Sequence, residues 1–190
     1  MARWEPGTRE RLVRAALELF TEQGYDNTTV AQIAERAGLT KTTFFRHFPD
    51  KREVLFAGQD MHSRLLADAI ATAPGPATPL QAVAAALDAV TSTFTDDRRE
   101  FAARLRAVIA GNSELRERAA FKRAGLTEAM TEALEKRGVP DLTASLAAEL
   151  GVRAFYGAFA RWADPASQQT FTELAREALR ELRAAAAALD

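Results

Sequence analysis

The stretch Gly24–Leu55 reads GYDNTTVAQIAERAGLTKTTFFRHFPDKREVL, and it holds two short helix-forming segments separated by only three residues. Thr29 and Gln32 have the spacing of a capping box, in which a hydroxyl and an amide each satisfy a helix-end N–H group. Gly38 permits a tight reversal, and Thr40 can cap the segment that follows. Two short helices joined by such a turn are typical of a helix-turn-helix.

The second of these helices is predicted to span Lys41–His47, closed by Pro49. Its spacing places Phe44 inward, with Ile33 and Phe48. The opposite face then presents short polar, basic and aromatic side chains suited to contact with base edges: Lys41, Thr42, Phe45 and Arg46.

This region is also locally basic. Between Arg36 and Arg52 there are five basic residues, one acidic residue and His47, whereas the whole chain has 25 basic and 26 acidic residues and a formal charge of −1. A local charge of +4 attracts a phosphate backbone through counterion release. Charge alone would equally fit a solvated helical face, and the turn spacing, the caps and the exposed side chains favour nucleic acid.

The composition predicts an all-α fold. The chain has 190 residues, with 41 alanines but only eight valines and three isoleucines, which favours helices over sheets. Apolar spacing and Gly or Pro breaks predict about nine helices, the second of them short, between Thr29 and Gly38. The other eight are expected at Thr8–Gln23, Lys41–His47, Lys51–Ala71, Leu80–Phe94, Asp97–Ala110, Glu114–Arg137, Leu142–Ala163 and Gln168–Leu189.

Several function classes are excluded or disfavoured. The chain has no cysteine, only His47 and His62 as histidines, and no phosphate-binding glycine loop, HExxH or GxSxG motif, so we expect no catalytic residues, no metal site, no cofactor and no enzymatic activity. No apolar run approaches the roughly 18 residues that span a bilayer. We therefore expect a soluble cytoplasmic protein without membrane contact.

The segment from Leu12 to Leu55 resembles the N-terminal domain of TetR-type transcriptional regulators. The resemblance implies a three-helix helix-turn-helix domain at residues 1–50 and a larger effector-binding and dimerisation bundle at residues 51–190. It further implies a homodimeric, ligand-responsive repressor whose third helix enters the major groove of a pseudopalindromic double-stranded DNA operator.

Carried over residue by residue, the resemblance assigns phosphate contacts to Thr29, Thr43, His47 and Lys51, and base contacts to Lys41 and Thr42. Lys41 suits a phosphate as well as a base. Position 45 departs from the family's usual tyrosine, and the Phe45 ring could pack on a thymine methyl group.

The larger helical portion suggests an effector cavity and a dimer interface. A cavity for a small apolar or aromatic effector would be lined by Met61, Leu65, Phe94, Phe101, Leu105, Phe121, Met130, Tyr156 and Trp162. The last two helices would pair with their copies in a four-helix interface, through small residues on one helix and a leucine-rich seam on the next: Ala147, Gly151, Ala154, Gly157, Ala158, Phe171, Leu174, Leu179 and Leu182.

The sequence leaves one alternative open. A helical interaction protein could keep the same fold without reading DNA, and binding that ignores sequence or salt would favour that alternative over a regulator.

Overall fold

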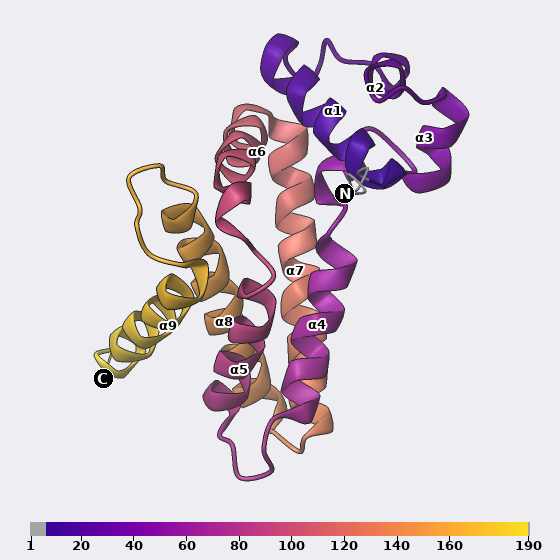
Figure 1. Ribbon diagram of the computed structural model, residues 1–190. Coiled ribbons are helices and arrows are strands. Elements are labelled where there is room, and N and C mark those ends of the chain that lie inside the picture. Colours follow the sequence, from indigo (N-terminus) through magenta and orange to yellow (C-terminus); the bar gives the residue numbers. More distant parts are fainter. Residues whose placement is uncertain (1–6, 190) are drawn as a thin grey trace, which may run out of the picture. The chain divides into compact units, whose positions relative to one another are not determined.

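The computed structural model describes residues 7–189, and within that range all regular structure is helical (Figure 1). Nine α-helices and two short 3₁₀ helices follow one another in the described range: α1 (Thr8–Gln23), α2 (Val30–Arg36), α3 (Lys41–His47), η1 (Arg52–Phe56), α4 (Gln59–Thr72), α5 (Pro79–Thr91), η2 (Asp96–Arg98), α6 (Arg99–Gly111), α7 (Ser113–Lys136), α8 (Asp141–Trp162) and α9 (Phe171–Ala187). The all-α prediction is confirmed. None of the helices described here is long and apolar enough to cross a membrane.

The first three helices begin and end close to where the sequence places them, because their end signals are local. The fourth differs. A continuous helix from Lys51 to Ala71 was expected, but Asp50 Oδ1 accepts the backbone N–H groups of Arg52 (2.8 Å) and Glu53 (3.1 Å) and starts η1 instead. Gly58, a residue that disfavours a helix interior, separates this turn from α4.

The last helix also begins later than expected, at Phe171 rather than Gln168. Thr170 and Glu173 form a capping box: Thr170 Oγ1 accepts the Glu173 N–H (3.2 Å), and Glu173 Oε2 accepts the Thr170 N–H (2.8 Å). This T-x-x-E signal is present in the sequence, so the start of α9 was readable there.

The chain divides into two compact units. Among the described residues, the first holds 7–58 together with Arg104–Ala120, and the second holds Gln59–Ala103 and 121–189. The boundaries of these two compact units therefore differ from the predicted domain boundary after residue 50. Which residues bind DNA and which bind effector is a separate matter, and that functional division stays a prediction.

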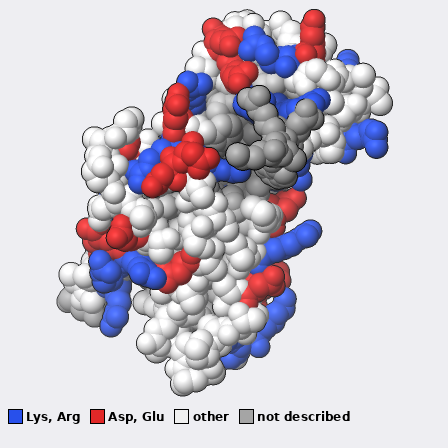
Figure 2. All heavy atoms as spheres, viewed as in Figure 1, with Lys and Arg blue, Asp and Glu red and all other residues white. Residues whose placement is uncertain are grey.

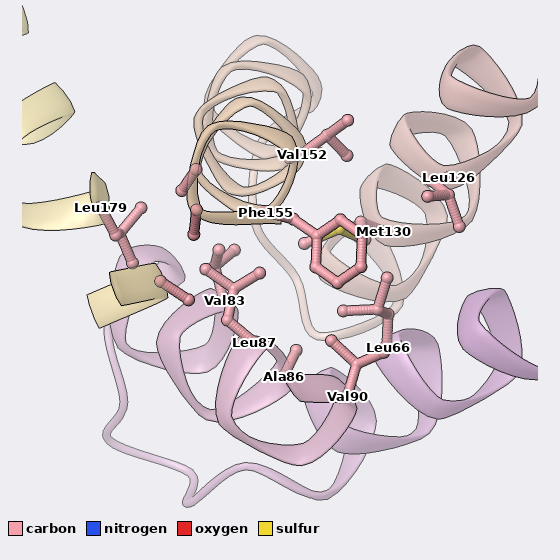
Figure 3. Close-up of a cluster of buried hydrophobic side chains, with 14 of the residues drawn as sticks. Leu66, Val83, Ala86, Leu87, Val90, Leu126, Met130, Val152, Phe155 and Leu179 are labelled. Carbon is pink, nitrogen blue, oxygen red and sulfur yellow. The ribbon is translucent and has the colours of Figure 1, made fainter. Parts of the chain in front are cut away.

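The core of the second unit is formed by α4, α5, α7, α8 and α9 (Figure 3). Leu66 of α4, Val83 of α5, Met130 of α7, Phe155 of α8 and Leu179 of α9 are all buried in one cluster. Burial of such side chains is worth about 1.5–3 kcal/mol each, which makes this cluster the main source of the unit's stability.

Two arginines bind the carboxyl ends of helices in this unit. Arg137 donates to the carbonyl oxygens of Ile70 (3.1 Å), Ala73 (2.8 Å) and Pro74 (2.8 Å), after the last turn of α4. Arg99 donates to Trp162 O (3.2 Å) at the end of α8, and to carbonyls in the loop that follows. Carbonyl groups that a helix end leaves without partners are thereby satisfied.

Gly151 marks the closest approach in the core. A Cβ atom at this position would lie 2.6 Å from Val83 Cγ1 and 2.9 Å from Met130 Cε. We expect Gly151→Ala to lower the free energy of unfolding by about 1–3 kcal/mol through overpacking. A Cβ atom at Gly125, in α7, would have no neighbour within 4 Å. We therefore expect Gly125→Ala to raise the free energy of unfolding by roughly 0.5–1 kcal/mol. Urea denaturation of both variants checks the opposite signs, and equal effects would contradict this packing.

Candidate DNA-binding surface

The helix-turn-helix is built by the local signals that the sequence contains. Thr29 Oγ1 accepts the Gln32 N–H (3.3 Å) while Gln32 Oε1 accepts the Thr29 N–H (2.8 Å), so the capping box is confirmed. Gly38 has φ 66°, the left-handed geometry that ends α2. Thr40 Oγ1 then accepts the Thr43 N–H (3.1 Å) and caps α3.

Aromatic packing on the inner side holds α3 against its neighbours. Phe44 and Ile33 are 0% exposed and Phe48 is 2% exposed, as predicted, and the Phe44 and Phe48 rings lie 5.5 Å apart. Leu12 of α1 is also fully buried. With its inner side fully used, α3 can present only its other side to a ligand.

The outer side of α3 carries the residues predicted to meet DNA. Lys41, Thr42, Phe45, Arg46 and His47 are exposed, and Thr43 is half-buried. Thr29 is exposed at the start of α2. Figure 2 shows Lys and Arg side chains over the α3 end of this unit. One rigid surface therefore presents the hydroxyl, basic and aromatic groups together.

The positive charge available on this surface is smaller than the sequence suggested. Arg36 forms a bidentate pair with Glu22 (2.9 and 2.8 Å), and its hydrogen bond lowers the pKa of the Glu22 carboxyl. Arg52 pairs with Asp50 (2.9 Å). Within the described residues Lys41 and Arg46 have no acidic partner, so these two carry the charge that is free for phosphate.

Lys51 has a structural role that sequence reasoning missed. Its ammonium donates to the carbonyl oxygens of Tyr25 (2.8 Å) and Thr28 (2.9 Å) and lies 4.0 Å from the centre of the Tyr25 ring. These bonds attach Lys51 to the loop that precedes α2. Spacing could not reveal them, because 26 and 23 residues separate the partners. The predicted phosphate contact of Lys51 stays a prediction.

The predicted effector-binding residues differ widely in how far they are buried. Met130 and Trp162 are 0% exposed within the core, whereas Met61 and Phe121 are 56% and 66% exposed. Leu105 belongs to the first unit, and the remaining four candidates are partly buried in the second: Leu65, Phe94, Phe101 and Tyr156. The role of these nine residues in binding an effector stays a prediction.

His62 is a candidate that sequence reasoning did not place in this region. Its ring lies 5.1 Å from that of Phe94 and 6.5 Å from that of Phe155, and burial lowers its pKa. Burial also raises the pKa of Tyr156, whose ring lies 4.2 Å from the Arg123 guanidinium. A neutral imidazole and a protonated phenol are thus present among apolar rings. No signal in the sequence distinguished His62 from an ordinary surface histidine.

Most of the residues predicted to form the dimer interface are used inside the chain. Seven of the nine are buried: Ala147, Gly151, Ala154, Ala158, Phe171, Leu174 and Leu179. Leu182 is partly buried, and Gly157 alone is exposed. Four of these seven residues lie on α8 and three on α9, and they are buried among residues of their own chain. Their role in a dimer interface stays a prediction. The apolar side chains that α8 exposes instead are Leu142 (80%) and Leu146 (57%).

The contacts of Lys51 lead to a prediction about stability. We expect Lys51→Ala to lower the free energy of unfolding by roughly 1–3 kcal/mol, because the Tyr25 and Thr28 carbonyl groups both lose the ammonium donor and Tyr25 O keeps only the Thr28 N–H (3.2 Å). Lys41→Ala removes the same charge from an exposed site and should change the free energy of unfolding by less than about 0.5 kcal/mol. Guanidinium denaturation measures both, and a Lys51 variant as stable as the wild type would leave the phosphate contact as the role of that residue.

Comparisons with known proteins agree with this geometry. Residues 12–57 match the model of the bacterial regulatory proteins of the tetR family. The chain is 42% identical to the transcriptional regulator TcmR of Streptomyces glaucescens over 93 residues, which cover 49% of this chain and 41% of TcmR. It is 48% identical to the regulator SrpR of Pseudomonas putida over 50 residues, 26% of this chain and 24% of SrpR. The matched stretches thus span less than half of either relative.

Solved structures of similar fold cover nearly the whole chain. FadR of Bacillus subtilis has a TM-score of 0.61 at 19% identity and covers 91% of this chain and 96% of its own. A putative TetR-family regulator of Syntrophomonas wolfei has a TM-score of 0.63 at 17% identity and covers 95% of both chains. At these identities the likeness concerns the fold alone, and the match to the tetR family concerns residues 12–57. Residues 12–57 are therefore similar to the helix-turn-helix domain of the tetR family of bacterial regulatory proteins, and the fold of the chain is similar to that of solved regulators.

Proposed function

We propose that this protein is a DNA-binding transcriptional repressor that binds a pseudopalindromic operator as a homodimer and responds to a small effector. One observation carries the proposal: α3 buries Phe44 completely and leaves Lys41, Thr42, Phe45 and Arg46 exposed on its other side. A helix fixed in this way behind a tight turn has the form that enters a major groove.

The roles within this surface follow from side-chain chemistry. Thr42 and Lys41 read base edges, and Phe45 packs on a thymine methyl group. Thr29 stands at the start of α2, where the hydroxyl and the helix dipole favour a phosphate, and Thr43 and His47 add further backbone contacts. Lys51 contributes to phosphate binding mainly by holding the loop in front of α2.

The second copy is proposed to pack on the exposed side of α8. Leu142 and Leu146 are four residues apart and lie on one side of the helix, and Gly157 leaves space further along it. The exposed side of α9 carries charged residues instead, including Arg176, which pairs with Asp88 (2.8 Å). Because α8 exposes leucines whereas α9 exposes charged residues, a symmetric apolar contact between two copies is favoured through α8.

The effector is proposed to be apolar or aromatic and to enter the second unit beside His62. The rings of Phe94, Phe155 and Tyr156 supply apolar contacts, while the His62 imidazole and the Tyr156 hydroxyl supply polar ones. The Bacillus subtilis FadR structure of similar fold was solved in complex with stearoyl-CoA, which carries a long apolar chain. An effector regulates only through unequal affinity for the DNA-bound and free conformations.

Selection of binding sites from a random duplex library tests the main proposal. We expect an enriched site with two half-sites about one DNA turn apart, and an affinity that falls steeply as salt rises from about 50 to 200 mM. Thr42→Ala should change the preferred bases, since it removes a side chain proposed to read them. Failure to enrich any sequence, with binding insensitive to salt, would favour the helical interaction protein instead.

A charge on α8 tests the proposed dimer. We expect Leu146→Glu to convert the dimer to a monomer, because a symmetric contact would bury two like charges facing each other. Ala124→Glu, on the exposed side of α7, adds the same charge elsewhere and should leave the dimer intact. Sedimentation equilibrium distinguishes the two, and a Leu146 variant that remains dimeric would place the interface on another surface.

A further inference from the structure

The turn between α6 and α7 reaches the loop between α1 and α2, within the first compact unit. The Tyr25 hydroxyl donates to Glu114 Oε1 (3.2 Å), and Asn112 Nδ2 donates to Asp26 Oδ1 (3.3 Å). Glu114 Oε1 also lies 3.3 Å from Arg52 Nε. Residues about 90 positions away in the sequence therefore contact the loop that leads into the capped end of α2.

Lys51 holds the same loop from another direction. Its ammonium binds the carbonyl oxygens of Tyr25 and Thr28 and faces the Tyr25 ring. Thr29, whose side chain caps α2, is the next residue along the chain. The backbone just before the first turn of α2 is thus fixed by an ammonium group, and the Tyr25 side chain is fixed by a carboxylate.

Several features make the Glu114 contact a strong constraint. Tyr25 is only 6% exposed, and its hydroxyl uses Glu114 as its acceptor in a partly buried hydrogen bond, which is costly to leave unmade. Burial, with Glu114 as a further cause, raises the pKa of Tyr25, and the hydroxyl remains a donor at neutral pH. Asn112 Oδ1 accepts the Leu115 N–H (3.1 Å), and Leu115 is fully buried, which anchors the turn that carries Glu114.

We propose that Glu114 is a positioning residue for operator binding: through Tyr25 it holds the α1–α2 loop so that Thr29 and the start of α2 face a phosphate. The proposal rests on the proposed function of this chain. It assigns a DNA-binding contribution to a negative side chain on α7, outside the helix-turn-helix and outside the residues matched by the family model.

The sign of the effect separates positioning from simple electrostatics. Removing a carboxylate from a DNA-binding unit should strengthen binding to a polyanion if only charge matters. Positioning has the opposite consequence, and we expect Glu114→Ala to weaken operator binding by about three- to thirtyfold. Glu117→Ala is the matched control, because Glu117 is exposed on the same helix and has no ion-pair partner in the described part of the chain.

Two further variants isolate the hydrogen bond. Tyr25→Phe changes no charge, keeps the ring beside Lys51 and removes the hydroxyl, so it should weaken binding to a similar extent. Glu114→Gln loses the same charge as Glu114→Ala but retains an oxygen that can accept from Tyr25, so it should recover most of the lost affinity. Because the phenylalanine variant leaves the α7 turn unchanged, it carries the test even if Glu114→Ala fails to fold.

The measurements are operator affinity by fluorescence anisotropy and phosphate-ethylation interference on the selected operator. We expect the interference at the phosphate facing α2 to weaken in Glu114→Ala and Tyr25→Phe, while base contacts of α3 persist. The proposal is wrong if Glu114→Ala and Glu117→Ala both bind the operator at least as tightly as the wild type. A wild-type protein that binds no operator would instead refute the proposed function itself, so the two failures are distinguishable.

Discussion

Complete burial of one side of α3 is the constraint on which the recognition surface depends. Phe44 and Phe48 are buried with their rings 5.5 Å apart where α3 contacts α2, and this leaves the seven residues of α3 with only one side free. A helix this short is unstable alone in water, so its order comes from that packing and from the Thr40 cap. The polar and basic tips are consequently held in fixed positions, which reduces the entropy lost when a rigid groove is bound.

The loop in front of α2 extends this constraint beyond the helix-turn-helix. Its carbonyl groups are held by Lys51, and its tyrosine is held by Glu114, so the capped end of α2 depends on residues before and after it in the chain. The first compact unit accordingly includes Arg104–Ala120. Arg118 of α7 pairs with Glu53 of η1, which adds another contact between these segments. The recognition surface and the α6–α7 turn therefore form one structural unit.

In the second unit, small residues allow helices to approach within the chain. Gly151 leaves room for Val83 and Met130, and alanines of α8 are buried beside it. The same pattern of small residues also suits a contact between copies, which explains why sequence reasoning assigned it to a partner. Once α5 and α7 occupy that side of α8, Leu142 and Leu146 remain outside as its apolar surface.

The sequence by itself determined the all-α class, the bounds of α1 and α3, the Thr29–Gln32 capping box and the exposed residues of α3, because these depend on neighbours within four residues. It also contained the family match over residues 12–57. Only the tertiary structure decided that Lys51 binds two carbonyl groups, that Glu114 receives the Tyr25 hydroxyl and that Gly151 faces α5. Helical periodicity shows which residues share a side of a helix, but the identity of the facing partner depends on contacts between segments distant in the chain, which no local pattern records.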